Sequence, residues 1–320
     1  MRIFFCTTPK AGSQWFRDLL CNHLSADAVP WRHRRHANRE FNVVLGRWPE
    51  PEEEEIFYGP IYQMEPGFVA DRIRPEDRVF CVVRDPRDLA VSWMWSTAYS
   101  HMSGSPSVDL QRPILRALPL RLRIRLALAR VFGFSRFQAL WVASDDPRIL
   151  VLRYEDLIKD TAGLLARCYE HAGTTLPDRL VRAIVDHFSF RRRAGRTPGK
   201  EDVQSHHRKG VAGDWRNYLD RELGDLIERI HPGLLANLGY EDDEDWWRVL
   251  PEQLPALREE DATAERDREL DLLNRQVEGL ERRNRELQRE ADARLEVIEG
   301  LKRAADERLE IIERLQGAGG

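Results

Sequence analysis

Short, uninterrupted apolar runs recur along the chain and are separated by longer stretches with helical periodicity. The runs at residues 3–6, 79–83 and 149–152 are each rich in β-branched or aromatic side chains. An apolar run without alternation is typical of a strand buried on both faces, as in a parallel sheet. Residues 56–62, Ile-Phe-Tyr-Gly-Pro-Ile-Tyr, are a further strand candidate, although Gly59-Pro60 interrupts the run.

The stretches between these runs carry the spacing of amphipathic helices. Helices are predicted over residues 13–23, 88–99, 114–132 and 163–172. Alternation of buried strands and helices predicts an α/β fold, with a central parallel sheet flanked by helices on both faces. This domain is expected to span residues 1–250.

The composition changes after Trp246-Trp247, and the chain becomes charged and periodic. Residues 251–269, which contain two prolines, are interpreted as a linker, and residues 270–316 as a coiled-coil helix. Asn284 falls on an a position, where a buried polar residue can determine register. The segment therefore predicts a homodimer, although a single solvated amphipathic helix would show the same spacing. The apolar positions are Leu270, Leu273, Val277, Leu280, Leu287, Ile298, Leu301, Ile312 and Leu315.

The charge distribution bears on the kind of ligand. The net charge of −4 argues against a general nucleic-acid-binding protein. Residues 259–316 hold 12 Lys/Arg and 18 Asp/Glu, so the rest of the chain carries about +2. A mildly basic body suits a small anionic ligand better than a nucleic-acid backbone.

The cysteines and the absence of long apolar stretches bear on compartment. The four cysteines show no short spacing and no neighbouring histidine cluster, so no metal site is predicted. Three of them lie in apolar runs and are expected to be buried thiols, as in a reducing compartment. No stretch approaches the roughly 20 apolar residues of a membrane-spanning helix. A cytoplasmic protein without a transmembrane segment or signal peptide is expected.

Residues 5–15, Phe-Cys-Thr-Thr-Pro-Lys-Ala-Gly-Ser-Gln-Trp, join the end of a predicted strand to the start of a predicted helix through a tight turn. Such a turn directs backbone N–H groups and the positive helix end at an anion. Lys10 adds a charge, Gly12 permits close backbone approach, and Ser13 is expected to cap the helix. The usual nucleotide loop, G-x-x-x-x-G-K-[ST], has its lysine after the glycine. Because the order is reversed here, an ATPase or kinase loop is disfavoured.

Two further basic segments follow. In residues 84–92, Arg-Asp-Pro-Arg-Asp-Leu-Ala-Val-Ser, Arg84 ends a predicted strand and Ser92 lies eight residues later. Both side chains are suited to one phosphate, since the guanidinium can make bidentate contacts. Residues 206–215, His-His-Arg-Lys-Gly-Val-Ala-Gly-Asp-Trp, supply two more cations and a glycine. Basic segments so far apart in sequence indicate one ligand with two separated anionic ends.

Taken in order, these motifs resemble those of the sulfotransferases that use 3′-phosphoadenosine 5′-phosphosulfate (PAPS). The first loop of that family reads roughly PK[ST]G[ST]TW, against PKAGSQW here. Its arginine with a serine eight residues later matches RDPRDLAVS, its RKGxxGDW motif is intact as RKGVAGDW, and LRYEDL at 152–157 is similar to its tyrosine-containing strand end. The resemblance covers residues 3–219. It implies a P-loop-like three-layer fold and PAPS as the cofactor, with no metal.

The resemblance implies roles for individual residues. The loop for the 5′-phosphosulfate comprises Lys10, Ala11, Gly12, Ser13, Gln14 and Trp15. The site for the 3′-phosphate comprises Arg84, Ser92, Arg208, Lys209 and Gly210. Tyr154 is expected near the adenine, where Phe190 could stack, and Trp215 is expected to pack in the core.

Two loop residues depart from the family pattern. Ala11 replaces a common serine or threonine, and Gln14 replaces the usual threonine with an amide. Lys10 is the predicted catalytic cation, because charge builds on the leaving phosphate during sulfuryl transfer.

The general base is left open by the sequence. The cytosolic branch of the family has a Lys-Thr-His segment before the second motif, but residues 57–67 contain no histidine. His36 and Glu40 are the leading candidates for the base, His33 lies beside them, and Glu65 is a further one. A solvated connection without a catalytic role is equally compatible with the segment around His36.

The predicted reaction is transfer of a sulfuryl group from PAPS to a hydroxyl, or an amine, of a small-molecule, glycan or lipid-linked acceptor. Residues 112–136 carry seven arginines and no acidic residue. They are interpreted either as a lid for an anionic or lipid-linked acceptor or as a surface helix that packs its leucines. The alternative function is a catalytically weak nucleotide-binding module whose coiled coil serves assembly. A small-molecule kinase is a third and weaker hypothesis.

Overall fold

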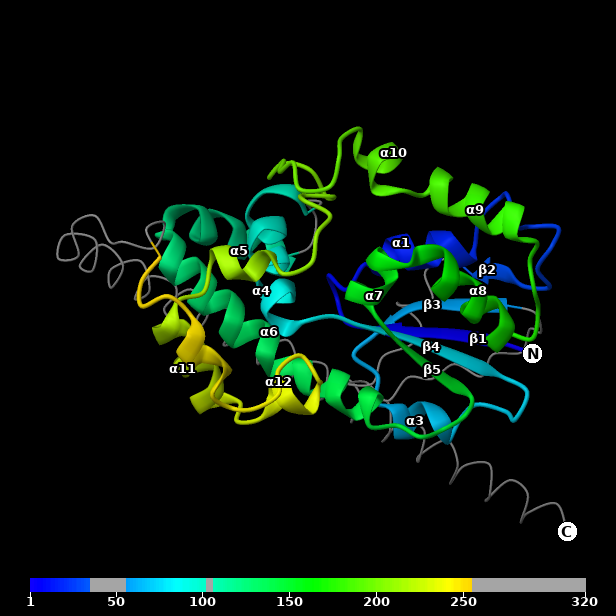
Figure 1. Cartoon of the computed structure of the whole chain (residues 1–320), viewed down its shortest axis with the longest axis horizontal. Coiled ribbons are helices and arrows are strands. Elements are labelled where there is room, and N and C mark those ends of the chain that lie inside the picture. Colours follow the sequence, from blue (N-terminus) through cyan, green and yellow to red (C-terminus); the bar gives the residue numbers. More distant parts are fainter. Residues whose placement is uncertain (35–55, 102–105, 255–320) are drawn as a thin grey trace, which may run out of the picture. The chain divides into compact units, whose positions relative to one another are not determined.

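The structure, a computed structural model, describes residues 1–34, 56–101 and 106–254. Its strands are β1 (Ile3–Thr7), β2 (Arg32–Arg34), β3 (Ile56–Tyr62), β4 (Arg78–Val83) and β5 (Ile149–Arg153). Within these residues they form one sheet in the order β2-β3-β1-β4-β5, and every neighbouring pair is parallel (Figure 1). The predicted parallel sheet is confirmed, including the strand interrupted by Gly59-Pro60.

Burial on both faces of the sheet explains the uninterrupted apolar runs. Ile3 and Phe5 of β1 belong to one core cluster, whereas Phe4 and Cys6 belong to a second cluster on the opposite face. All four are fully buried. Successive side chains of a strand point to opposite faces, so a strand covered on both sides needs apolar residues at every position.

The helices cover both faces, as Figure 1 shows for α1 and α8 on one side and α3 on the other. The cluster around Ile3 and Phe5 includes residues of α1, α4, α6 and α8, and the opposite cluster includes Val69 of α3 and Trp141 of α6. The α-helices in the described residues are α1 (Ser13–Leu20), α3 (Pro66–Ala70), α4 (Pro86–Trp95), α5 (Pro106–Ala117), α6 (Leu120–Val142), α7 (Tyr154–Lys159), α8 (Thr161–His171), α9 (Asp178–His187), α10 (Phe190–Ala194), α11 (Arg221–Ile230) and α12 (Leu234–Asn237). A π-helical turn, Ser96–Ser100, follows α4, and short 3₁₀ turns span Asp214–Asn217 and Trp246–Val249.

Several predicted helix boundaries are wrong for local reasons. The helix predicted over 114–132 is two helices, because Pro119 lacks the N–H that would continue α5 and instead precedes the first turn of α6. Helix α4 begins at Pro86, two residues earlier than predicted, where the Asp85 side chain caps it by accepting from Arg87 N at 2.9 Å. Helix α1 ends at Leu20 rather than residue 23.

The structure also tests the predicted burial of the cysteines and of Trp215. Cys6, Cys81 and Cys168 are buried free thiols, as predicted. Trp215 is a core residue, 3% exposed.

The chain divides into the units Met1–Arg258 and Glu259–Gly320. The predicted coiled coil at 270–316, with Asn284, and the predicted linker after residue 254 lie outside the described residues. No helix in the described ranges is long and apolar enough to cross a membrane.

Candidate functional site

The loop between β1 and α1 turns through two residues with left-handed backbone conformation. Lys10 has φ 75° and Gly12 has φ 80°. At Gly12 a Cβ atom would also come within 2.9 Å of the Tyr154 ring, so only glycine fits there. Lys10 adopts the same region without being glycine, at a cost of about 1–3 kcal/mol that its surroundings must offset. Strain of this kind concentrates at functional sites.

The first residues of α1 make contacts that the sequence did not predict. Gly12, not Ser13, is the N-cap residue, and no side chain caps the helix, so the predicted serine cap is wrong. The Ser13 hydroxyl instead lies 3.0 Å from the Tyr62 hydroxyl at the end of β3. The Gln14 side-chain oxygen accepts from Arg17 Nη1 at 2.5 Å. Trp15 Nε1 donates to the carbonyl of Phe188 at 3.0 Å, which joins α1 to the segment after α9.

Arg84, at the end of β4, connects the loop to the neighbouring strand. Its Nη1 donates to the carbonyl of Lys10 at 2.9 Å, and its guanidinium lies 4.3 Å from the centre of the Tyr154 ring. Gln138 of α6 holds the Arg84 backbone by accepting from its N at 2.8 Å and donating to its carbonyl at 3.0 Å. The Thr8 hydroxyl donates to the same glutamine oxygen at 3.4 Å. A buried glutamine thus holds the ends of β1 and β4 together.

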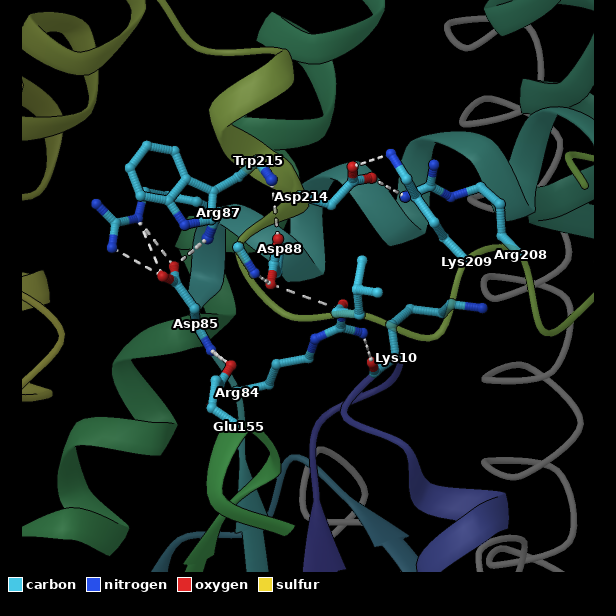
Figure 2. Close-up of polar contacts among 12 residues, drawn as sticks. Lys10, Arg84, Asp85, Arg87, Asp88, Glu155, Arg208, Lys209, Asp214 and Trp215 are labelled. Carbon is cyan, nitrogen blue, oxygen red and sulfur yellow. Dashed lines mark hydrogen bonds and ion pairs between the residues drawn. The ribbon is translucent and has the colours of Figure 1, made fainter. Parts of the chain in front are cut away.

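Asp88 of α4 positions the loop that carries the third basic motif (Figure 2). Its carboxylate accepts from Gly213 N at 2.7 Å and from Trp215 N at 3.0 Å. Arg84 Nη2 lies 3.8 Å from the same carboxylate. Burial raises the pKa of Asp88, and the charge of Arg84 opposes that rise.

Asp214 pairs with both cations of the third motif. Its carboxylate contacts Arg208 Nη2 and Lys209 Nζ, the two side chains that Figure 2 shows pointing toward it. Burial would raise the pKa of Asp214, but hydrogen bonds from Lys209 and Arg208 outweigh it and leave the pKa lowered. The pairing holds both cations beside the loop 210–213.

These segments enclose a cavity of about 640 Å³. Twelve of the thirteen residues that the sequence assigned to cofactor binding line it. They are Lys10, Gly12, Ser13, Gln14, Trp15, Arg84, Ser92, Tyr154, Phe190, Arg208, Lys209 and Gly210. Phe190 packs on the backbone of Gly210, since a Cβ at Gly210 would lie 2.2 Å from the ring.

The remaining predicted residues are placed elsewhere or not described. Ala11 is fully buried beneath the loop and does not line the cavity. Glu65 is exposed at the start of α3 and does not line the cavity either. His33 Nε2 lies 3.0 Å from the Gly59 carbonyl oxygen, outside the cavity lining. His36 and Glu40 lie outside the described residues.

Sequence reasoning missed several residues of the cavity wall. The sequence carried a local signal for three of them, since His206 and His207 directly precede Arg208, and Arg193 belongs to an arginine run after Phe190. The others come from the end of β3 and from the π-helical turn after α4, which no motif marks. The missed polar residues are Tyr62, Ser96, Ser100, His101, Arg193, His206 and His207.

The cavity wall is strongly cationic. Among the described residues that line it there is no Asp or Glu. Removal from water, together with the charges of Arg84 and Arg208, lowers the pKa of Lys10 to about 8. Lys10 is therefore mostly protonated at neutral pH. A cavity with this charge can hold an elongated ligand with an anionic group at each end.

The arginine-rich segment 112–136 packs on the domain body where it is described. Arg121 pairs with Asp220 at 2.5 Å and with Glu222 at 2.6 Å, and Arg116 Nε donates to the Ala98 carbonyl at 2.7 Å. None of its described residues lines the cavity. The contacts are those expected for a surface helix rather than for a lid.

Comparison with known proteins finds the following similarities. The family model described as "Sulfotransferase domain" matches residues 1–239. The chain is 22% identical to 3-beta-hydroxysteroid sulfotransferase of Cavia porcellus, over 72% of this chain and 82% of the relative. It is 24% identical to Sulfotransferase 2B1 of Mus musculus, over 72% of this chain and 70% of the relative. The solved structure of mouse sulfotransferase SULT7A1 complexed with PAP has a TM-score of 0.49 and 19% identity, covering 75% of this chain and 87% of that chain.

Proposed function

This chain belongs to the sulfotransferase domain family, and from that membership we propose that it transfers a sulfuryl group from PAPS to a hydroxyl, or an amine, of an acceptor. One observation carries the proposal. Twelve residues assigned to the donor from separate sequence motifs line a single cavity without an acidic residue in its described wall. Three of the five segments meet there because the carboxyl ends of the neighbouring parallel strands β1, β4 and β5 lie side by side, and the segments at Phe190 and Arg208–Gly210 complete the wall.

The residues present fit a donor with phosphate-type groups at two ends. Lys10 and the backbone of 12–15 are proposed to hold the 5′ end, because a left-handed turn before a helix presents N–H groups to an anion. Arg84 and Ser92 are proposed to hold the 3′-phosphate, together with the loop Arg208–Gly210. When bound, PAPS supplies an activated sulfuryl group whose leaving group is a phosphate. Tyr154 and Phe190 are proposed to lie against the adenine.

Lys10 is proposed to balance the charge that develops on the leaving phosphate. Its position supports this role, since its backbone carbonyl is held by Arg84 and its side chain lines the cavity. A cation whose place is determined before the reaction stabilises the transition state without reorganisation at that moment. Gln14 departs from the usual threonine, and its amide is engaged by Arg17.

The general base stays a proposal with two candidates, His36 and Glu40. Glu65 is the weaker choice because it is exposed and does not line the cavity. The base must reach the acceptor oxygen, directly or through one water, to take its proton as the new sulfur–oxygen bond forms.

The acceptor is proposed to be a hydroxyl-bearing small molecule, with glycan and lipid-linked acceptors as further possibilities. The Cavia porcellus relative is named for a 3-beta-hydroxysteroid, which is an acceptor of this chemical class. We also propose that the chain is cytoplasmic and forms a homodimer through residues 270–316. The alternative function is a weakly active nucleotide-binding module whose coiled coil serves assembly.

Binding of the desulfated product tests the donor assignment. We expect 3′,5′-adenosine bisphosphate (PAP) to raise the unfolding temperature well above the shift that ATP produces. A hundredfold excess over the dissociation constant corresponds to about 2.7 kcal/mol of added stability. The matched control is Arg84→Ala, which should show a reduced shift with PAP. Equal shifts with ATP and PAP would refute the assignment of the donor.

Transfer itself is tested by incubating the full chain with ³⁵S-labelled PAPS and a host extract, then identifying the labelled product. Label should appear in an organic acceptor with wild type and be absent with Lys10→Ala. Tight PAP binding without labelled product would favour the alternative, a weakly active nucleotide-binding module.

A further inference from the structure

His206 and His207 line the same cavity, and neither imidazole ring has a hydrogen-bond partner among the described residues. The two rings lie edge to face with centroids 5.6 Å apart. Their situation differs from that of His171, whose Nε2 lies 3.0 Å from the Arg148 carbonyl oxygen inside the fold. Two ring systems with unused polar atoms therefore face the space assigned to the donor.

Charged and titratable groups face His206 from several elements. They are Lys10 of the first loop, His207, His101 after the π-helical turn and Arg193 of α10. Burial first, and then these groups, lower the pKa of His206 to about 4. The imidazole is therefore neutral at pH 7 in the protein without a ligand.

His207 has similar surroundings with one carboxylate nearby. Burial first, then the charges of Arg193, Lys10 and Arg196, lower its pKa, and Asp18 of α1 acts in the opposite direction. Asp18 is itself paired with Arg193 at 2.6 Å, and the charge of Arg193 opposes its effect on the ring. His207 is thus also neutral near pH 7.

We propose that His206 and His207 are further ligands of the anionic donor, and that they bind it as imidazolium ions after taking up protons. The inference rests on the proposed function, because the ligand is the nucleotide assigned to this cavity. Each phosphate monoester of PAP carries about −1.5 to −2 at pH 7. That charge compensates the lysine and arginines that, together with burial, keep the rings neutral, so it favours the protonated form of both rings.

The consequence is a proton uptake linked to nucleotide binding. The rings have a higher pKa in the complex than in the free protein, so binding tightens as pH falls between the two values. The gain is at most about tenfold in affinity per pH unit for each proton taken up. Release of the nucleotide product is correspondingly favoured at higher pH.

Isothermal titration calorimetry of the full chain with PAP tests the proposal. Titrations at about pH 6.5 in two buffers of different ionisation enthalpy report the protons taken up per nucleotide, because buffer and protein exchange the same protons. Wild type is compared with His206→Asn/His207→Asn and with His231→Asn. His231 is a matched control, since burial lowers its pKa and it does not line the cavity. The phosphates of PAP also titrate near pH 6, so the quantity compared is the difference between proteins in the same two buffers, which reports the proton uptake that depends on the two histidines.

We expect wild type and His231→Asn to take up about half a proton or more per nucleotide beyond the double variant. Loss of PAP binding by a folded double variant, with its unfolding midpoint unchanged, would also support the role as ligands. Should the double variant not fold, the single variants His206→Gln and His207→Gln replace it. Equal uptake and equal affinity in all proteins would overturn the proposal while leaving the donor site intact. Absence of PAP binding by wild type would instead refute the proposed function, and this inference with it.

Discussion

Replacing Asp88 by alanine is expected to release the loop that carries the third basic motif. The Asp88 side chain is 1% exposed, and its two oxygens are its links to that loop. They accept from Gly213 N at 2.7 Å and Trp215 N at 3.0 Å. The substitution therefore leaves two backbone donors without a partner and removes a negative charge 3.8 Å from Arg84.

The magnitude follows from these losses. Each orphaned buried donor costs about 1–3 kcal/mol. Removing one partner of a buried charge pair typically costs about 3–5 kcal/mol. The terms overlap, because one carboxylate serves both functions, so we expect Asp88→Ala to lower the free energy of unfolding by about 3–5 kcal/mol. Asp88→Asn keeps one acceptor oxygen and should lose only about 1–3 kcal/mol.

Urea unfolding followed by circular dichroism measures these differences, and PAP titration measures the effect on the loop. Asp186→Asn is the control, because its ion pair with Arg192 is solvent-exposed and should contribute less than about 1 kcal/mol. PAP affinity should fall at least about tenfold in Asp88→Ala, which equals the loss of one charge-assisted hydrogen bond. If Asp88→Ala matched the Asp186→Asn control in both stability and affinity, the carboxylate would not hold the loop.

Three further predictions concern the cavity and the tail. Lys10→Ala should lower turnover more than PAP affinity, because the charge of Lys10 acts on the transferring group. Arg84→Ala should instead weaken PAP binding by about 1.5–3 kcal/mol. Measurements of kcat and of the Kd for PAP check both variants, and equal changes in the two would contradict the division of roles. Gly210→Ala should weaken PAP binding, because the new Cβ would lie 2.2 Å from the Phe190 ring at a φ of 65°; an unchanged Kd by calorimetry would show that the loop adapts without cost. A chain ending at residue 258 should be monomeric by light scattering and retain PAP affinity, and a monomeric full-length chain would exclude the tail as the dimerisation element.

Four of the five strands in the described residues could be predicted because their signals are local. The run at 79–83 has no polar residue, a pattern typical of a strand covered on both faces. The left-handed turn at Gly12 could be expected too, since glycine tolerates positive φ. Helix boundaries were less secure, although Asp85-Pro86 and Pro119 carry local signals for a start and a stop. These local signals, rather than any tertiary contact, account for the observed start of α4 and for the break between α5 and α6.

The contacts inside the cavity wall were beyond sequence reasoning. Ser13 was expected to cap α1 because serine favours that position, yet Gly12 caps the helix and the serine hydroxyl meets Tyr62, 49 residues away. His206 and His207 directly precede the RKGVAGDW motif, but the motif does not show that their rings line the cavity. The lowered pKa of His206 depends in part on the charge of Lys10, which lies almost two hundred residues earlier in the chain.

The amino-acid sequence by itself determined four of the five strands in the described residues, where the anion loop turns, and which cations belong to the motifs, because each depends on residues close together in the chain. The short strand β2 has no apolar run and was not predicted. Only the tertiary structure decided which of those groups meet. Gln138 joins Thr8 to Arg84 across 130 and 54 residues, and Asp88 holds backbone N–H groups 125 and 127 residues away. Such pairs form because parallel pairing aligns the carboxyl ends of β1 and β4 and packs α4 and α6 beside them. A hydrogen bond depends on that arrangement in space, which no local pattern of residues encodes.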